Sequence, residues 1–122
     1  YLFSNGDAHL KNFSVIETPF GDYRLSPAYD LLNSRIHTDD KDFALDDGLL
    51  PKYLAQGKIG WQFAKLAEKA EIRHKTFQEM MAWMISKTDR VEKMVAASFL
   101  KDSTKRKYFQ SYQGRLKQLT KG

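Results

Sequence analysis

Apolar residues follow two different periods along this chain, and the period changes near residue 59. Before that point, short apolar runs at residues 1–3, 13–18 and 23–25 are separated by polar and turn residues, a pattern typical of strands. Residues 19–22 read Pro-Phe-Gly-Asp, and these residue types favour turn conformations. The second and third runs are therefore predicted to form a β-hairpin.

From residue 59 onwards, apolar residues recur every three or four positions, which predicts helices. Four helices are expected, beginning near residues 59, 76, 88 and 102, with the last ending near residue 120. Thr88 or Asp89 and Asp102 or Ser103 are candidate caps, because these residue types are favoured at helix starts. The expected inward-facing residues are Trp61, Phe63, Leu66, Ala67, Ala70, Phe77, Met80, Met81, Met84, Ile85, Val91, Met94, Val95, Phe99, Tyr108, Tyr112, Leu116 and Leu119.

No regular period covers residues 26–41, and the acid-rich run at residues 39–42 is too charged for a core. Residues 43–45 are predicted to form a short strand, and the whole stretch is expected to be a mobile segment. Strands followed by helices predict an α+β fold with a small sheet and a helical bundle. We divide the chain into residues 1–50, with the loop, hairpin and candidate metal segment, and a helical part at residues 51–122.

Composition places the chain among ordinary globular proteins. It has 122 residues, of which 42% are hydrophobic and 29% charged, so one domain or a piece of one is expected. There is no apolar run near 18 residues and no signal-peptide pattern at the start, so no membrane association is expected. The absence of cysteine excludes disulfides and thiolate metal sites and fits a cytoplasmic protein.

Charge is divided unevenly between the two halves. Residues 1–60 contain 6 Lys and Arg against 9 Asp and Glu, a net −3, whereas residues 61–122 contain 14 against 6, a net +8. Clustered carboxylates in the first half suit cation binding. The basic half is either a solvated helical surface, which we favour, or a surface that faces a polyanion.

A polar loop between the first two expected strands carries the candidate chemistry. Asp7 is followed five positions later by Asn12, with His9 and Lys11 between them. Kinases use this spacing, since the Asp orients the attacking hydroxyl and accepts its proton, and the Asn oxygen holds Mg²⁺. The alternative is an ordinary loop, because Asp and Asn also favour turns. Four side chains able to bind metal or phosphate within six residues exceed what a turn needs.

Asp30 is the second candidate in the acidic half. It follows the run at residues 23–25 and has apolar neighbours on both sides. An acidic residue in such surroundings is costly to bury unless it binds a metal or is paired. Equally, Asp30 is a suitable N-cap for a helix beginning at Leu31. Both interpretations stay open at this point.

Two sequence strings together resemble a known family. N-G-D-A-H-L-K-N-F-S at residues 5–14, followed by P-A-Y-D-L-L at residues 27–32, is similar to the C-terminal domain of HipA-type kinases. These are the serine/threonine-kinase toxins of bacterial toxin–antitoxin systems. The D-x-H-x-x-N segment also resembles the catalytic loop of lipid kinases of the phosphatidylinositol type. The resemblance implies the C-terminal lobe of a protein-kinase-like fold.

Matched position by position, the resemblance implies a role for each residue. Asp7 falls on the catalytic base, and Asn12 and Asp30 on the residues that hold Mg²⁺ and, through it, ATP. Lys11 is expected to neutralise charge on the transferring phosphoryl group. His9 is expected to orient the loop by hydrogen bonds instead of transferring protons.

The resemblance also implies an activity and partners. The expected reaction is transfer of the ATP γ-phosphoryl group to a protein hydroxyl. The expected partners are a protein substrate, a HipB-like DNA-binding antitoxin and, through that complex, operator DNA. A kinase also needs an N-terminal lobe with a phosphate-covering loop and a Lys–Glu pair. These do not precede Tyr1 here, so the chain is expected to be the C-terminal part of a longer protein and close to inactive alone.

A competing hypothesis is a DNA-binding or partner-binding helical module without catalysis. Residues 61–70 and 76–85, joined by a break at residues 71–74, have the layout of a helix-turn-helix. The turn lacks glycine and the second helix is Met-rich, so packing within a core is favoured, although a Met-rich face also suits a partner groove. A basic run at residues 101–107 is a further candidate phosphate contact, with a solvated helix face as the default.

Overall fold

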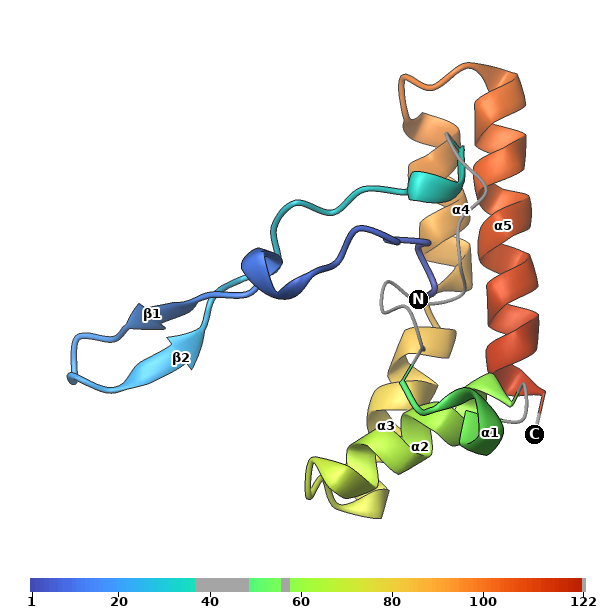
Figure 1. The fold of residues 1–122 in the computed structure, drawn as a ribbon. Coiled ribbons are helices and arrows are strands. Elements are labelled where there is room, and N and C mark those ends of the chain that lie inside the picture. Colours follow the sequence, from blue (N-terminus) through green and yellow to red (C-terminus); the bar gives the residue numbers. More distant parts are fainter. Residues whose placement is uncertain (37–48, 56–57, 122) are drawn as a thin grey trace.

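Residues 5–33 form an arm that carries a β-hairpin and projects from a body made of helices (Figure 1). This computed structural model describes residues 1–36, 49–55 and 58–121. The expected strand at residues 43–45 and the acidic run at residues 39–42 lie outside the described residues. A two-stranded sheet followed by helices confirms the predicted α+β fold. None of the described helices is long and apolar enough to cross a membrane.

The hairpin of the arm forms where the sequence predicts it. Strand β1, Val15–Glu17, pairs antiparallel with strand β2, Tyr23–Leu25. The Thr18 amide donates to the Asp22 carbonyl (2.8 Å), and the Gly21 amide donates to the Thr18 carbonyl (3.0 Å). Gly21 has a φ of 78°, a left-handed conformation that glycine adopts without steric cost. The prediction of a further strand at residues 1–3 is wrong. The Ser4 amide donates a hydrogen bond back to the Tyr1 carbonyl, so the chain turns here.

Helices make up most of the described remainder. The elements are the 3₁₀ turns η1 (Leu10–Asn12) and η2 (Ser34–Ile36) and the helices α1 (Lys52–Ala55), α2 (Ile59–Lys69), α3 (His74–Ile85), α4 (Thr88–Ala97) and α5 (Asp102–Thr120). The four predicted helices are thus confirmed as α2 to α5. The expected caps are wrong, because Lys87 and Lys101 occupy the N-cap positions of α4 and α5. Thr88 begins α4, and its hydroxyl donates to the Ile85 carbonyl (3.2 Å).

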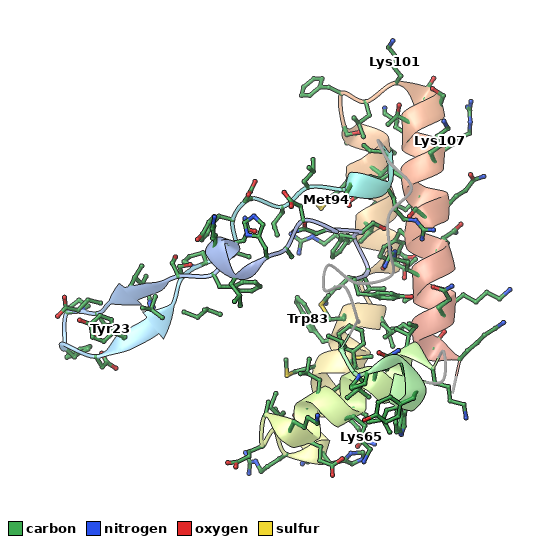
Figure 2. All side chains as sticks on the ribbon, in the orientation of Figure 1. Tyr23, Lys65, Trp83, Met94, Lys101 and Lys107 are labelled. Carbon is green, nitrogen blue, oxygen red and sulfur yellow. The ribbon has the colours of Figure 1, made fainter. Side chains whose placement is uncertain are left out.

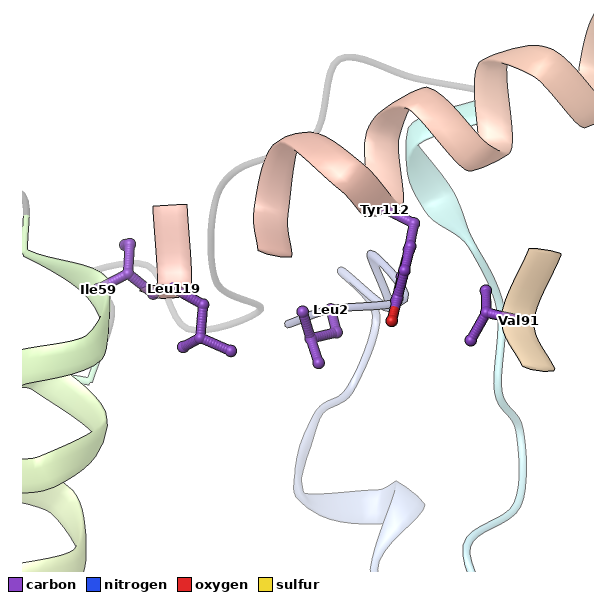
Figure 3. Close-up of a cluster of buried hydrophobic side chains, with 5 residues drawn as sticks. All are labelled: Leu2, Ile59, Val91, Tyr112 and Leu119. Atoms are coloured by element: carbon purple, nitrogen blue, oxygen red, sulfur yellow. The ribbon is translucent and has the colours of Figure 1, made fainter. Parts of the chain in front are cut away.

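The hydrophobic core joins the start of the chain to the helices. Figure 3 shows its buried members, Leu2, Ile59, Val91, Tyr112 and Leu119. The Tyr112 side chain is 1% exposed, and its ring stacks on those of Phe3 and Phe109 at centroid distances of 5.7 and 6.1 Å. Of residues 1–3, Leu2 is therefore buried in the core, and Tyr1 and Phe3 pack against it without pairing as a strand.

Several residues expected to face inward are exposed: Trp61, Leu66, Ala70, Met80, Met94 and Phe99. Phe99 follows the end of α4, in the connection to α5, where no helical face directs it inward. Met80 and Met94 lie on helices that are covered on one side, since α3 packs on α2 and α4 packs on α5. The apolar stripes of these helices are therefore wider than the faces that the described residues cover.

The close approach of α2 to the end of α5 gives a stability prediction. A Cβ atom on Gly60 would lie 2.7 Å from the Leu119 carbonyl oxygen, whereas one on Gly114 would meet nothing within 4 Å. Gly60→Ala should therefore lower the free energy of unfolding by about 1–3 kcal/mol through overpacking. Gly114→Ala should raise it by about 0.5–1 kcal/mol, because alanine loses less entropy in a helix. Urea unfolding of both variants tests this, and shifts of the same sign would contradict the packing of α2 on α5.

Candidate active site

The polar loop ends in η1, and Asn12 holds this turn from both its backbone and its side chain. The Asn12 amide donates to the His9 carbonyl (2.9 Å), while Asn12 Oδ1 accepts a bond from the His9 amide (3.1 Å). The Asp7 carbonyl also accepts a bond from the His9 amide (2.9 Å). His9 thus helps to shape the loop through its backbone.

The hairpin returns the chain so that Asp30 lies against the loop. Asn12 Nδ2 donates to Asp30 Oδ2 at 2.6 Å, a contact between residues 18 positions apart. The Tyr29 hydroxyl reinforces it by donating to the Lys11 carbonyl (3.1 Å). The two side chains expected to hold metal are therefore brought together by the fold. Tyr29 was not expected to act in the site, and its position next to Asp30 was the only signal for it.

Asp30 does not cap a helix. The next described element after it is η2, which begins at Ser34, and residues 31–33 form no helix. The alternative that Asp30 caps a helix at Leu31 is therefore wrong. Asp30 also has a φ of 53°, a left-handed conformation that is uncommon outside glycine, although Asp adopts it more readily than most residues. Such backbone conformations cluster at functional sites.

The other three candidates lie on the surface of the loop. Asp7, His9 and Lys11 are all exposed, and among the described residues the side chains of Asp7 and Lys11 form no hydrogen bond or ion pair. The Asp7 carboxylate is thus accessible to a hydroxyl substrate. The structure joins Asn12 to Asp30 directly and places Asp7, His9 and Lys11 on the same loop without such a contact.

A small cavity lies beside the Asn12–Asp30 pair. Its volume is about 110 Å³, and its lining includes Asn12, Phe13, Leu25, Tyr29 and Leu31. Pockets for drug-sized ligands and cofactors are typically about 300–1,000 Å³. The space is therefore too small for a nucleotide and has the scale of an ion or a single phosphate group.

The side-chain oxygen atoms of Asn12 and Asp30 are of the type that binds Mg²⁺. The ion prefers oxygen ligands and is commonly held by one or two carboxylates together with substrate phosphates and water. Asp30 supplies a carboxylate and Asn12 a carboxamide oxygen, but the 2.6 Å contact is made by Asn12 Nδ2, and Asn12 Oδ1 accepts the bond from the His9 amide. Within residues 1–36, 49–55 and 58–121, no group of three or more His, Cys, Asp or Glu side chains is placed to hold a metal ion.

Ser34 ties together the two ends of the arm, near residues 4–6 and 34, where the arm joins the helices. We call this place the root of the arm and its two chain segments the legs. The Ser34 amide and hydroxyl both donate to the Ser4 carbonyl (2.9 and 3.0 Å), and Ser34 Oγ accepts a bond from the Gly6 amide (2.9 Å). Ser4 is 1% exposed, and its hydroxyl lies 3.1 Å from that of Ser111 on α5. No spacing in the sequence marks these serines as supports of the loop.

Two regions of the helical half were candidates for binding DNA or a partner: the helix pair with its break at residues 71–74, and the basic run at residues 101–107. The break between α2 and α3 is closed by bonds from the Glu71 amide to the Glu68 carbonyl and from the Ile72 amide to the Ala67 carbonyl. Met81 and Met84 pack against the core, as expected of a buried helix face. At the start of α5, Lys101 and Lys107 are exposed (Figure 2).

Comparisons with known proteins agree with these strings and this fold. A family model described as the HipA-like C-terminal domain matches residues 1–110. A protein of Sinorhizobium fredii, named "Putative kinase Y4dM", is 41% identical over 75 residues. That alignment covers 61% of this chain and 18% of the relative, so the chain spans less than a fifth of the length of this curated relative.

Proposed function

Since the chain belongs to the family of HipA-like C-terminal domains, whose function is related to kinases, we propose that it carries the catalytic and metal-binding half of a serine/threonine protein kinase. The observation that carries the proposal is the direct contact of Asn12 with Asp30, beside the loop that bears Asp7. This contact brings together the two sequence strings at residues 5–14 and 27–32.

The residues divide the reaction among them. Asp7 orients the substrate hydroxyl and accepts its proton while the hydroxyl oxygen bonds to the γ-phosphorus and the bond to the ADP oxygen breaks. Asn12 and Asp30 would hold Mg²⁺, which neutralises charge on the phosphates of ATP when bound. Lys11 supports this neutralisation, and the His9 amide holds Asn12 in place.

The remaining half of the nucleotide site is proposed to lie in other parts of a longer protein. The cavity beside Asn12 is about 110 Å³, too small for ATP, and the relative is more than five times as long as the stretch that aligns with this chain. Because phosphoryl transfer depends on positioning and charge neutralisation, half a site supplies little rate enhancement. Residues 1–122 alone are therefore expected to be close to inactive.

The biological setting extends the same proposal. By its family, the kinase would act in the cytoplasm as the toxin of a toxin–antitoxin pair. Its partners would be a protein substrate and a HipB-like antitoxin that binds operator DNA. Co-purification of the full-length gene product with the product of a neighbouring gene tests the antitoxin partner.

Phosphoryl transfer with radiolabelled ATP is the direct test of the kinase proposal. The full-length gene product should phosphorylate itself or a protein substrate in the presence of Mg²⁺, and chelation of the ion by EDTA should reduce transfer to background. Residues 1–122, assayed in parallel, should stay near background under both conditions. Transfer that persists in EDTA would contradict the metal role, and no transfer by the full-length protein would contradict the kinase assignment.

A second candidate function rests on the basic helical half. A cavity of about 300 Å³ is lined by apolar residues that include Trp83, Met94 and Val95, with Lys87 and Arg90 also lining it. This arrangement favours a module that binds an anionic partner or DNA without catalysis. Binding of duplex DNA that falls steeply with salt and survives loss of Asp7 and Asp30 would support it. Absence of binding at low salt would remove the DNA form of this alternative.

A further inference from the structure

Large apolar side chains of the arm are exposed to solvent to an unusual degree. Leu10, Phe20 and Leu31 are 87%, 94% and 74% exposed. Single exposed apolar residues are normal on protein surfaces, but contiguous apolar patches mark contact sites. Side chains that share one face of the arm would form such a patch.

The strand register answers this for the hairpin. Val15 lies opposite Leu25 and Glu17 opposite Tyr23, and alternation along a strand puts these four residues on one face. Val15, Tyr23 and Leu25 are 62%, 68% and 64% exposed, and we call these three residues the docking face. The fourth residue of this side of the hairpin, Glu17, is charged and lies opposite Tyr23.

The opposite face of the hairpin is different. It carries the pair Ile16 and Arg24, and Ile16 is only 38% exposed. Each face thus holds one charged residue, but the first face has three open apolar side chains and the opposite face has one, which is less exposed. A two-stranded hairpin is at best marginally stable in water unless a face packs against something else. Figures 1 and 2 show the hairpin, with Tyr23, extending away from the helical body.

The docking face continues into the candidate active site. Leu25 lines the cavity beside Asn12, together with Phe13 and Leu31, which are 57% and 74% exposed. A surface that covered Val15, Tyr23 and Leu25 would therefore also approach the Asn12–Asp30 pair. Excluding water there would strengthen the electrostatic interactions of both side chains.

We propose that the docking face packs against an apolar surface of the remaining polypeptide of a longer gene product. The inference rests on the proposed function, because the rest of a kinase must approach Asn12 and Asp30 to complete the nucleotide site. The aligned region makes up 18% of the curated relative, so more than four-fifths of that protein lies outside it and offers ample surface. The contact couples folding of the arm to assembly of the site.

Hydrogen–deuterium exchange in the full-length gene product and in residues 1–122 tests the contact. Amides of α5 serve as the internal reference in each protein, so slower exchange that is confined to the hairpin reports the docking. Amides of residues 15–17 and 23–25 should exchange at least about tenfold more slowly in the full-length protein. Equal rates in the two proteins would overturn the proposal.

Matched variants identify the face. In the full-length protein, Tyr23→Ser and the milder Leu25→Ala should restore fast exchange of the hairpin, and Arg24→Ser on the opposite face should not. Unchanged protection in both docking-face variants would overturn the proposal. If residues 1–122 self-associate through Tyr23 while the full-length hairpin shows no added protection, the occupant is a second copy and the proposal is again overturned.

The same samples separate this inference from the kinase assignment. A protected hairpin in a full-length protein that transfers no phosphoryl group would leave the docking contact standing and remove the proposed activity. Active protein with an unprotected hairpin would remove the docking contact and leave the activity. Asp7→Ala should strongly reduce transfer without changing hairpin exchange, because Asp7 is exposed and lies outside the docking face.

Discussion

Replacing Asp7 by Ala in the full-length gene product is expected to lower the rate of phosphoryl transfer by about 10²–10⁴-fold. The carboxylate is the proposed base for the attacking hydroxyl, and no other acidic residue lies between Asp7 and Asn12 on the loop. Its exposed side chain has no hydrogen-bond partner among the described residues, so the variant should fold normally. Initial rates with saturating ATP and Mg²⁺ measure the effect.

Glu79→Ala is the matched control for Asp7. Glu79 is an exposed acidic residue on α3, outside the arm, so its removal changes the net charge equally without touching the loop. Activity of this variant should match that of the unmodified protein. An Asp7→Ala variant that retains the full rate would sink the assignment of Asp7 as the base, and with it the main support for a kinase loop here.

Asp30→Asn should reduce phosphoryl transfer by about 10²–10³-fold, the scale on which the loss of a positioned electrostatic group acts. Asparagine keeps the size of the side chain and an oxygen that can accept the bond from Asn12 Nδ2, now 2.6 Å from Asp30 Oδ2. The substitution therefore removes the negative charge while leaving the contact possible. The rate measured against Mg²⁺ concentration should show a higher requirement for the ion.

Asp22→Asn provides a control with the same chemistry in the same arm. The Asp22 carboxylate accepts a hydrogen bond from the Thr18 hydroxyl within the hairpin turn, away from the loop. This variant should keep both its rate and its Mg²⁺ requirement. If Asp30→Asn behaved like it, Asp30 would act only in holding Asn12, and the metal site would have to lie elsewhere.

Elements set by local interactions were predictable from the sequence. The hairpin was predicted because residues 19–22 supply the turn chemistry and their flanks are apolar, and the helices were predicted because their apolar residues recur at helical spacing. These signals act within about ten residues of chain. The candidate site was predicted in part, since the family resemblance implied that Asn12 and Asp30 act together, but no local signal gave the hydrogen bond between them.

Features that depend on distant packing were not predictable. Residues 1–3 look like a strand, yet Leu2 is buried against the helices, and nothing local separates these two outcomes. Met80 and Met94 sit at helical spacing but lack a covering element among the described residues. The contact of Asn12 with Asp30 arises only because the hairpin folds back, so whether Asp30 lies against the loop or caps a helix could be decided only from the structure.

The bonds of Ser34 at the root have a mechanical consequence. Both legs of the arm are tied together there, through the Ser4 carbonyl and the Gly6 amide, and they are tied again at the Asn12–Asp30 contact. These two sets of hydrogen bonds brace the arm. A rotation of the arm about residues 4–6 and 34 would therefore carry the loop, Asp30 and the hairpin as one rigid unit. Approach of the arm to another body would then change the orientation of the loop and Asp30 together, while the hydrogen bond keeps the spacing of the Asn12 and Asp30 side chains constant.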